Sequence, residues 1–189
     1  QNFDYEAVTD IFVRVNSQGT RLRTAELAVA NLAFQLPGIV TRDLAGLQER
    51  LSETGWEIDT QVLLRMLNAV VTGQASFRRL STADTDAIEV GWPRLEAGVA
   101  RALDVIAARL GIKSVDWLPT ITALVVPVAY FADPKSGDAD IPALFNWFVR
   151  ASAFGRYTGQ TETRLNQDLR SLADRDRAFR IMTNMLRGT

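Results

Sequence analysis

The sequence predicts an all-α fold, an irregular multi-helix bundle of about nine helices that form one domain over residues 1–189. Three observations lead to this prediction. Apolar residues recur at helical spacing through most of the chain, and no window alternates with the period of two expected of a strand. The regular alternation of strand and helix patterns, separated by turn residues, that is typical of βαβ units is also missing. Because no long linker or internal repeat divides the chain, we expect a single helical domain.

The helices are expected at residues 5–15, 24–36, 42–53, 61–72, 81–110, 116–132, 141–153, 161–172 and 177–186. In the first, Val8 to Val15 places apolar residues at i, i+3, i+4 and i+7. Pro37-Gly38 ends the second, and Gly55-Trp56 ends the third. Each remaining helix is bounded in the same way, by turn residues on one side or the other.

Capping residues and prolines refine several of these boundaries. Asp59 or Thr60 is the expected N-cap of the fourth helix, and Gly111 ends the long fifth helix, which begins near Ser81 or Thr82. Trp92-Pro93 is expected to kink that helix or to split it in two. Pro142 falls in the first turn of the seventh helix, where proline is tolerated.

The most apolar stretch is Ile121–Ala132, inside the sixth predicted helix, which begins at Ser114 or Asp116. A membrane span needs about 20 apolar residues, so this shorter run predicts a buried helix, bent at Pro127. Five aromatic residues are predicted to lie in the core: Trp92, Trp117, Phe145, Trp147 and Phe148.

The composition excludes several kinds of chemistry. The formal net charge is −1, so no overall field draws the chain to nucleic acid or to a membrane. There is no Cys and no His, which excludes disulfides, Cys nucleophiles and His-based catalysis or zinc binding. The chain shows no signal peptide and starts at Gln1 within a helical pattern, so we expect a cytoplasmic fragment of a longer protein.

The first candidate site is the polar turn after the opening helix. Asn16, Ser17 and Gly19 end that helix between Arg14 and Arg21, and free backbone amides around Gly19 are typical of anion sites. The alternative is an ordinary helix C-cap, which is the interpretation that these residue types favour on their own.

The second candidate precedes and opens the helix at 161–172. Arg156 and Tyr157 lie just before a helix N-terminus, where anions bind readily. Thr161 is expected to cap the helix, Glu162 lies in its first turn, and Arg164 and Asp168 are spaced to pair across one turn. The alternative is a capped helix with a solvated ion pair.

The charges are unevenly distributed. From Arg150 onward the chain holds eight arginines and four acids, a net charge of +4, so the remainder carries −5. A local phosphate contact by this arginine-rich tail is one interpretation, and a helical surface with interleaved ion pairs is the other. Two acidic pairs, Asp84 with Asp86 and Asp138 with Asp140, lie where helices begin, which capping explains. No metal site is predicted.

Two strings give the chain a family resemblance. They lie more than a hundred residues apart and in the expected order: Phe12-x-Arg14-Val15-Asn16-Ser17-x-Gly19-x-x-Leu22 with Glu26-Leu27, and Gly155-Arg156-Tyr157-x-Gly159-x-x-Glu162-Thr163-x-Leu165-x-x-Asp168-Leu169. Together they resemble the signature of the GmrSD-type restriction endonuclease family, with most of the chain corresponding to its helical portion.

The resemblance implies a role that the residues alone do not show. Members begin with a module similar to ParB and sulfiredoxin that carries an Asp-Gly-Gln-Gln-Arg motif, associated with nucleotide binding or hydrolysis. Many end in a His-Asn-His nuclease domain, and they defend bacteria against phage, often by acting on modified DNA. By resemblance, Arg14, Asn16, Ser17 and Gly19 are the edge of a nucleotide site. A nucleoside triphosphate with Mg²⁺ is the cofactor implied for the full-length protein.

The chain also departs from the family pattern. The Asp-Gly-Gln-Gln-Arg motif is absent, there is no His for a nuclease domain, and Arg23 stands where the family often has Ser. We therefore expect a fragment without catalytic residues of its own, with residues 1–22 packing on an upstream ParB-like module and with DNA as a further partner. The alternative is a helical protein–protein interaction module, and a freestanding hydrolase is the least favoured interpretation.

Overall fold

The computed structural model describes residues 36, 38–76, 80, 83–174 and 178–186. These residues form seven α-helices and no strand, which confirms the all-α class. Each helix corresponds to one of the last seven predicted. The predicted helices at 5–15 and 24–36 lie outside the described residues, except for Leu36, which is not helical. The helices are α3 (Ala45–Glu53), α4 (Thr60–Thr72), α6 (Thr85–Leu110), α7 (Val125–Phe131), α8 (Ile141–Ala153), α9 (Thr161–Ser171) and α10 (Ala178–Met185).

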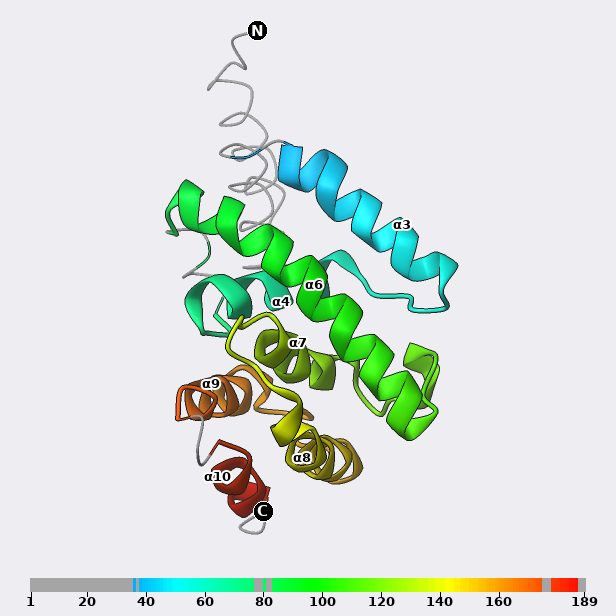
Figure 1. The fold of residues 1–189 in the computed structure, drawn as a ribbon, viewed down its shortest axis with the longest axis vertical. Helices are drawn as coiled ribbons and strands as arrows, with labels where there is room; N and C mark the ends of the chain where they lie inside the picture. Colours follow the sequence, from blue (N-terminus) through cyan, green and yellow to red (C-terminus); the bar gives the residue numbers. More distant parts are fainter. Residues whose placement is uncertain (1–35, 37, 77–79, 81–82, 175–177, 187–189) are drawn as a thin grey trace, which may run out of the picture.

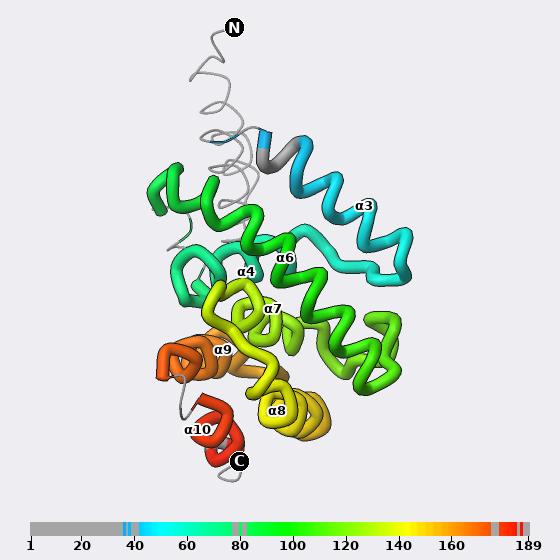
Figure 2. Tube along the Cα trace, in the orientation of Figure 1, coloured from blue at the N-terminus to red at the C-terminus, as the bar shows by residue number. Residues whose placement is uncertain are grey.

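The longest helix, α6, runs across the molecule and organises the others (Figure 1). It packs against α4 and α7, and these two helices also pack against each other. The tube view shows α3 along the other side of α6, and α8, α9 and α10 gathered at the end of the molecule that holds the C-terminus (Figure 2). Within that end, α10 packs on both α8 and α9.

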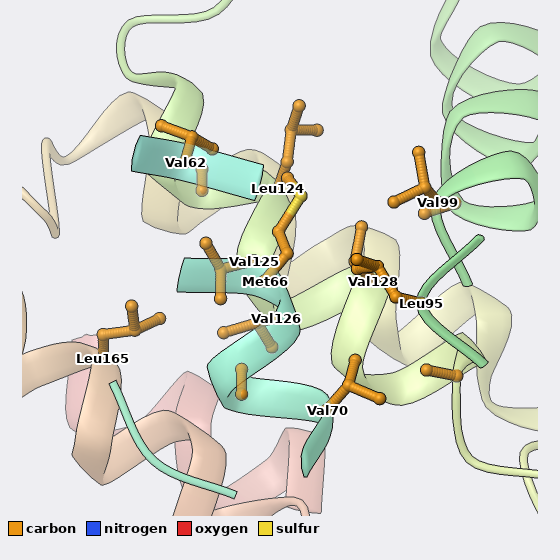
Figure 3. Close-up of a cluster of buried hydrophobic side chains, with 14 of the residues drawn as sticks. Val62, Met66, Val70, Leu95, Val99, Leu124, Val125, Val126, Val128 and Leu165 are labelled. Carbon is orange, nitrogen blue, oxygen red and sulfur yellow. The ribbon is translucent and has the colours of Figure 1, made fainter. Parts of the chain in front are cut away.

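The core lies where α4, α6 and α7 meet (Figure 3). Met66 of α4, Leu95 and Val99 of α6 and Val128 of α7 are almost completely buried there. Leu165 brings α9 to the same cluster. The predicted burial of the apolar run is confirmed for its central part, since every residue from 123 to 128 is buried.

Two glycines let α6 approach its neighbours closely. A Cβ at Gly98 would lie 2.7 Å from the Val128 carbonyl oxygen and 2.9 Å from the Ala132 backbone, and one at Gly91 would meet the Val71 side chain. Both glycines lie on the same face of α6, seven residues apart. Their lack of a side chain is therefore what allows α7 and α4 to pack against this helix.

The long helix is not split at Trp92-Pro93, in contrast to one of the two outcomes predicted. α6 continues from Thr85 to Leu110 with Pro93 inside it. Pro93 and Glu89 are both exposed. The Glu89 carbonyl, which loses its helical donor at the proline, is therefore on the side where water can replace that hydrogen bond. The helix also begins later than predicted, since Asp84 is its N-cap residue.

The predicted helix at 116–132 is wrong in its first half. The chain there forms a 3-10 turn at Val115–Trp117, an irregular stretch and a second 3-10 turn at Ile121–Leu124 before α7 begins. Pro127 falls in the first turn of α7, where no helical donor is lost, so it does not need to bend the helix. Trp117 is 66% exposed, which contradicts its predicted place in the core.

Other local predictions are confirmed or refined. The Asp59 carboxylate accepts a hydrogen bond of 2.8 Å from the Val62 amide and so caps α4. Gly73 and Gly111 end α4 and α6 in the left-handed conformation.

A π-helix at Ile39–Leu44 precedes α3. Within the described residues, no helix is both long and apolar enough to cross a membrane.

Candidate functional site

The second sequence string folds into the connection between α8 and α9. After Ala153 the chain turns back through Gly155 and Gly159, both at positive φ, and enters α9 at Thr161. The Thr158 amide and hydroxyl both donate to the Gly155 carbonyl, at 2.9 and 2.6 Å. This tight turn carries Arg156 and Tyr157 and directs them toward α9.

Arg156, Tyr157 and Asp168 meet in a buried cluster. The Arg156 guanidinium donates two hydrogen bonds to the Asp168 carboxylate, at 2.6 Å from Nε and 2.8 Å from Nη2. The Tyr157 hydroxyl donates a third to Asp168 Oδ2, at 2.7 Å. Arg156 and Tyr157 are each 3% exposed and Asp168 is 0% exposed. The carboxylate is thus held by three donors with no access to water.

The remaining residues of the motif surround this cluster without entering it. Arg164 donates from Nη1 to the Arg156 carbonyl, at 2.9 Å, and Glu162 is exposed in the first turn of α9. The predicted pairing of Arg164 with Asp168 across one turn is therefore wrong. Asp168 faces the interior and pairs with Arg156 instead, which its complete burial requires.

Thr161 does not cap α9 as predicted. The N-cap residue is Gln160, and the Thr161 hydroxyl donates to the Tyr157 carbonyl at 2.6 Å. Thr161 and Arg164 thus both bind backbone carbonyls of the turn that carries the cluster. This arrangement holds Arg156 and Tyr157 in place from the side of α9.

Burial and hydrogen bonding shift the pKa values of Asp168 and Arg156 in opposite directions. Burial raises the pKa of Asp168, although hydrogen bonds from Arg156 and Tyr157 act in the opposite direction. Burial lowers the pKa of Arg156, but the contacts with Asp168 and Tyr157 together outweigh it and leave that pKa raised. Burial and the nearby Asp168 charge raise the pKa of Tyr157 well above its ordinary value. Tyr157 is therefore a protonated donor throughout the neutral range.

A second polar contact joins α9 to the chain segment that follows α4. The amide group of Asn68, which is completely buried, donates to the carbonyls of Gln74 and Ser76, at 2.7 and 3.0 Å. Asn166 of α9 accepts a hydrogen bond from the Ala75 amide at 2.7 Å, across 91 residues. Sequence reasoning missed this contact. An Asn inside the apolar stretch of α4 was the available signal, because buried polar groups need partners.

The cluster cannot bind an external anion in this arrangement. The Arg156 charge is already neutralised by an internal carboxylate, and the predicted anion site before α9 is therefore occupied by the protein's own Asp168. The described residues also include no group of three or more acidic side chains placed to hold a metal ion. No step of a nucleotide reaction is assigned to the described residues.

The acidic pairs at the helix starts are not side-chain caps. Neither Asp84 nor Asp140 makes a side-chain capping hydrogen bond. Asp138 instead pairs with Arg101 at 2.8 Å, and Asp140 accepts a hydrogen bond from the Tyr130 hydroxyl at 3.1 Å. These carboxylates tie the turn before α8 to α6 and α7.

The first candidate site, Arg14, Asn16, Ser17 and Gly19, lies outside the described residues, so its geometry stays a prediction. Of the arginine-rich tail, Arg150, Arg170 and Arg180 are exposed, whereas Arg156 is buried. The tail is thus divided between a surface part and a core part.

No family model matches the chain, and no curated protein or solved structure is detectably similar to it.

Proposed function

We propose that the chain is the helical bracing module of a GmrSD-type, modification-dependent restriction protein that defends against phage. In this proposal it supports the edge of a nucleotide-binding module and contributes no catalytic residue. The observation that supports it is the burial of the central residues of the second family string. Arg156, Tyr157 and Asp168 are used entirely inside the fold, where they fasten α9 to the end of α8.

A catalytic role for Arg156, Tyr157 and Asp168 would require an accessible functional group, and these three side chains are buried and bonded to one another. A structural role explains all three side chains at once, because a buried Arg–Asp pair fixes the relative position of the elements that carry it. The role in nucleotide binding then rests on the first string, with Arg14 and Asn16 beside a phosphate held by an upstream ParB-like module. The whole protein would be a nucleotide-dependent DNA endonuclease.

The nucleotide role is tested in the full-length native protein by calorimetric titration with ATP, GTP, CTP and UTP in the presence of Mg²⁺. Arg14→Ala and Asn16→Ala should each weaken binding of the preferred nucleotide about tenfold, because each removes a contact to the ligand. Arg101→Ala, on the exposed side of α6, is the matched control and should bind as tightly as the wild type. Unchanged affinity in both turn variants would exclude the proposed site.

The exposed arginines supply the proposed DNA contact. Arg150 lies on α8, Arg170 on α9 and Arg180 on α10, the three helices gathered at one end of the molecule (Figure 1). Replacing all three with Gln should weaken duplex binding and reduce the slope of log K against log salt by about one per lost phosphate contact. Fluorescence anisotropy with modified and unmodified duplexes measures both effects. An unchanged slope would remove DNA from the proposal.

A helical protein–protein interaction module is the second candidate, and exposed apolar side chains favour it. Phe154, at the end of α8, is 67% exposed, and Val149 is 47% exposed. In and just after the last helix, Phe179, Met182 and Leu186 are buried and do not add to these exposed side chains. Nucleotide-dependent protection of the Asn16 amide from hydrogen exchange in the full-length protein would favour the bracing role over this one.

A further inference from the structure

Trp117 is presented to solvent by a turn that is itself well fixed. It ends the 3-10 turn Val115–Trp117, and the Ser114 hydroxyl accepts from the Asp116 amide at 3.3 Å and donates to the Asp116 carboxylate at 3.1 Å. Val115 and Leu118, on either side, pack partly against the core. The indole, 66% exposed, therefore projects from an anchored turn.

This exposure distinguishes Trp117 from every other tryptophan of the chain. The sequence has four, and the other three, Trp56, Trp92 and Trp147, are 8% exposed or less. An exposed Trp leaves a large apolar surface in water, and Trp is the residue type most enriched at the energetic centres of protein interfaces. An exposed indole on an anchored turn is thus a typical anchor for a protein partner.

The two chain segments that meet at the turn carrying Trp117 expose more carboxylates than cations. The backbone of Gly55, in the turn after α3, lies against the turn that follows α6, where a Cβ would be 3.3 Å from the Lys113 carbonyl oxygen. Figure 1 shows these two turns at the same end of α6. The two segments, 53–59 and 111–118, expose a single lysine and four carboxylates, on Glu53, Glu57, Asp59 and Asp116.

We propose that Trp117, with the carboxylates of Glu53, Glu57 and Asp116, forms a docking surface for an arginine- or lysine-rich segment of a partner protein. Such a segment places cations over the indole face and beside the carboxylates, so both features of the surface contribute. The same charges disfavour other occupants. DNA and anionic membranes would be repelled, and a second copy would bring like charges together.

The chain supplies its own optical probe for the test, because the remaining tryptophans are buried. The full chain is titrated with the dodecapeptides (Arg-Ala)₆ and (Glu-Ala)₆ and with a 12-base-pair DNA duplex, while the emission and acrylamide quenching of the indole are recorded. We expect (Arg-Ala)₆ to shift the emission to the blue, to protect Trp117 from acrylamide, and to bind more weakly as salt is added. (Glu-Ala)₆ and the duplex should have no effect.

Variants separate the indole from the carboxylates. With fluorescein-labelled (Arg-Ala)₆, Trp117→Ala should weaken binding about tenfold, as expected for an anchor residue. Glu57→Gln combined with Asp116→Asn should weaken it severalfold. Phe154→Ala, an exposed aromatic elsewhere, and Asp104→Asn, an exposed acid on α6, are the matched controls and should leave binding unchanged. Circular dichroism verifies that each variant is folded.

The proposal is overturned if the arginine peptide does not bind, if both peptides bind equally, or if Trp117→Ala binds as tightly as the wild type. Binding of the duplex at this surface, shown by protection of the indole, would also overturn it. A result of this kind would leave the nucleotide role of Arg14 and Asn16 unaffected, because that role is measured with different ligands and variants.

Discussion

Arg156 and Asp168, twelve residues apart in the chain, share two hydrogen bonds of 2.6 and 2.8 Å in a site closed to water. Removing two charges from water costs several kcal/mol per ion, and the cost is offset only when geometry and further hydrogen bonds are good. Tyr157 supplies such a bond at 2.7 Å. The cluster is therefore sensitive to the loss of any single member.

Asp168→Asn should lower the free energy of unfolding by about 3–5 kcal/mol, because it leaves the Arg156 charge buried without a counter-charge. Urea titration followed by circular dichroism measures the change. Asp138→Asn breaks an exposed ion pair with Arg101 and is the control, with an expected loss of at most about 1 kcal/mol. A similar small loss in Asp168→Asn would show that the buried pair does not hold α9 in place.

Tyr157 should resist ionisation at alkaline pH, because burial and the Asp168 charge raise its pKa well above 10.0. The folded chain keeps the phenolic proton more tightly than the unfolded chain does. The resulting stability is fully present below the unfolded pKa and is lost as pH rises through the folded one. In a spectrophotometric titration at about 295 nm, one tyrosine should ionise only as the fold is lost.

Tyr157→Phe provides the comparison for that titration. The late-ionising tyrosine should disappear, and the early part of the titration curve should be unchanged. The free energy of unfolding should fall by about 1–3 kcal/mol, because Asp168 loses a hydrogen-bond donor. If the late tyrosine persists in this variant, the phenol in question is not Tyr157.

Gly98→Ala should destabilise the chain by about 1–3 kcal/mol, because the added methyl group would overlap the Val128 carbonyl and the Ala132 backbone. Gly46→Ala is the control. It lies within α3, where the nearest atom to a new Cβ is the end of the flexible Arg50 side chain at 3.5 Å. There the substitution should stabilise the chain by about 0.5–1 kcal/mol. Thermal unfolding measures both changes. If Gly98→Ala stabilised the chain as Gly46→Ala is expected to do, the close approach of α6 and α7 would be contradicted.

Asn166→Ala should cost about 1–3 kcal/mol, since the Ala75 amide would be left without its acceptor. Hydrogen exchange of that amide should accelerate in the variant. Asn166→Asp retains an acceptor oxygen at the same position and should restore most of the protection. Fast exchange of the Ala75 amide in the wild-type chain would refute the contact between α9 and the segment after α4.

Helical spacing and turn residues were sufficient to predict the fold class and all seven described helices. Asp59, Gly73 and Gly111 act locally, so their roles can be recognised from neighbouring residues alone. The Ser114-capped turn was missed because its apolar residues also fit helical spacing, and only the tertiary packing of α7 decides where that helix begins. The exposure of Trp117 could not be predicted for the same reason.

In the candidate site too, local features could be predicted and long-range contacts could not. Residues 156 and 168 were recognised as belonging to one motif, but their partnership was assigned wrongly, because spacing along a helix favoured Arg164 for Asp168. The correct partner comes from the preceding turn, and a sequence does not indicate how a turn is folded back. Asn68 stands out as a polar residue in an apolar helix, but nothing near it in the sequence indicates that the distant Asn166 binds the same segment.

The unbroken length of α6 has a mechanical consequence. Its 26 residues make a rod about 39 Å long. Since Pro93 introduces no break, a tilt of about 4° at one end would displace the other by about 3 Å. A force applied at the turn that carries Trp117 would thus be transmitted along this continuous helix to its other end, near Thr85.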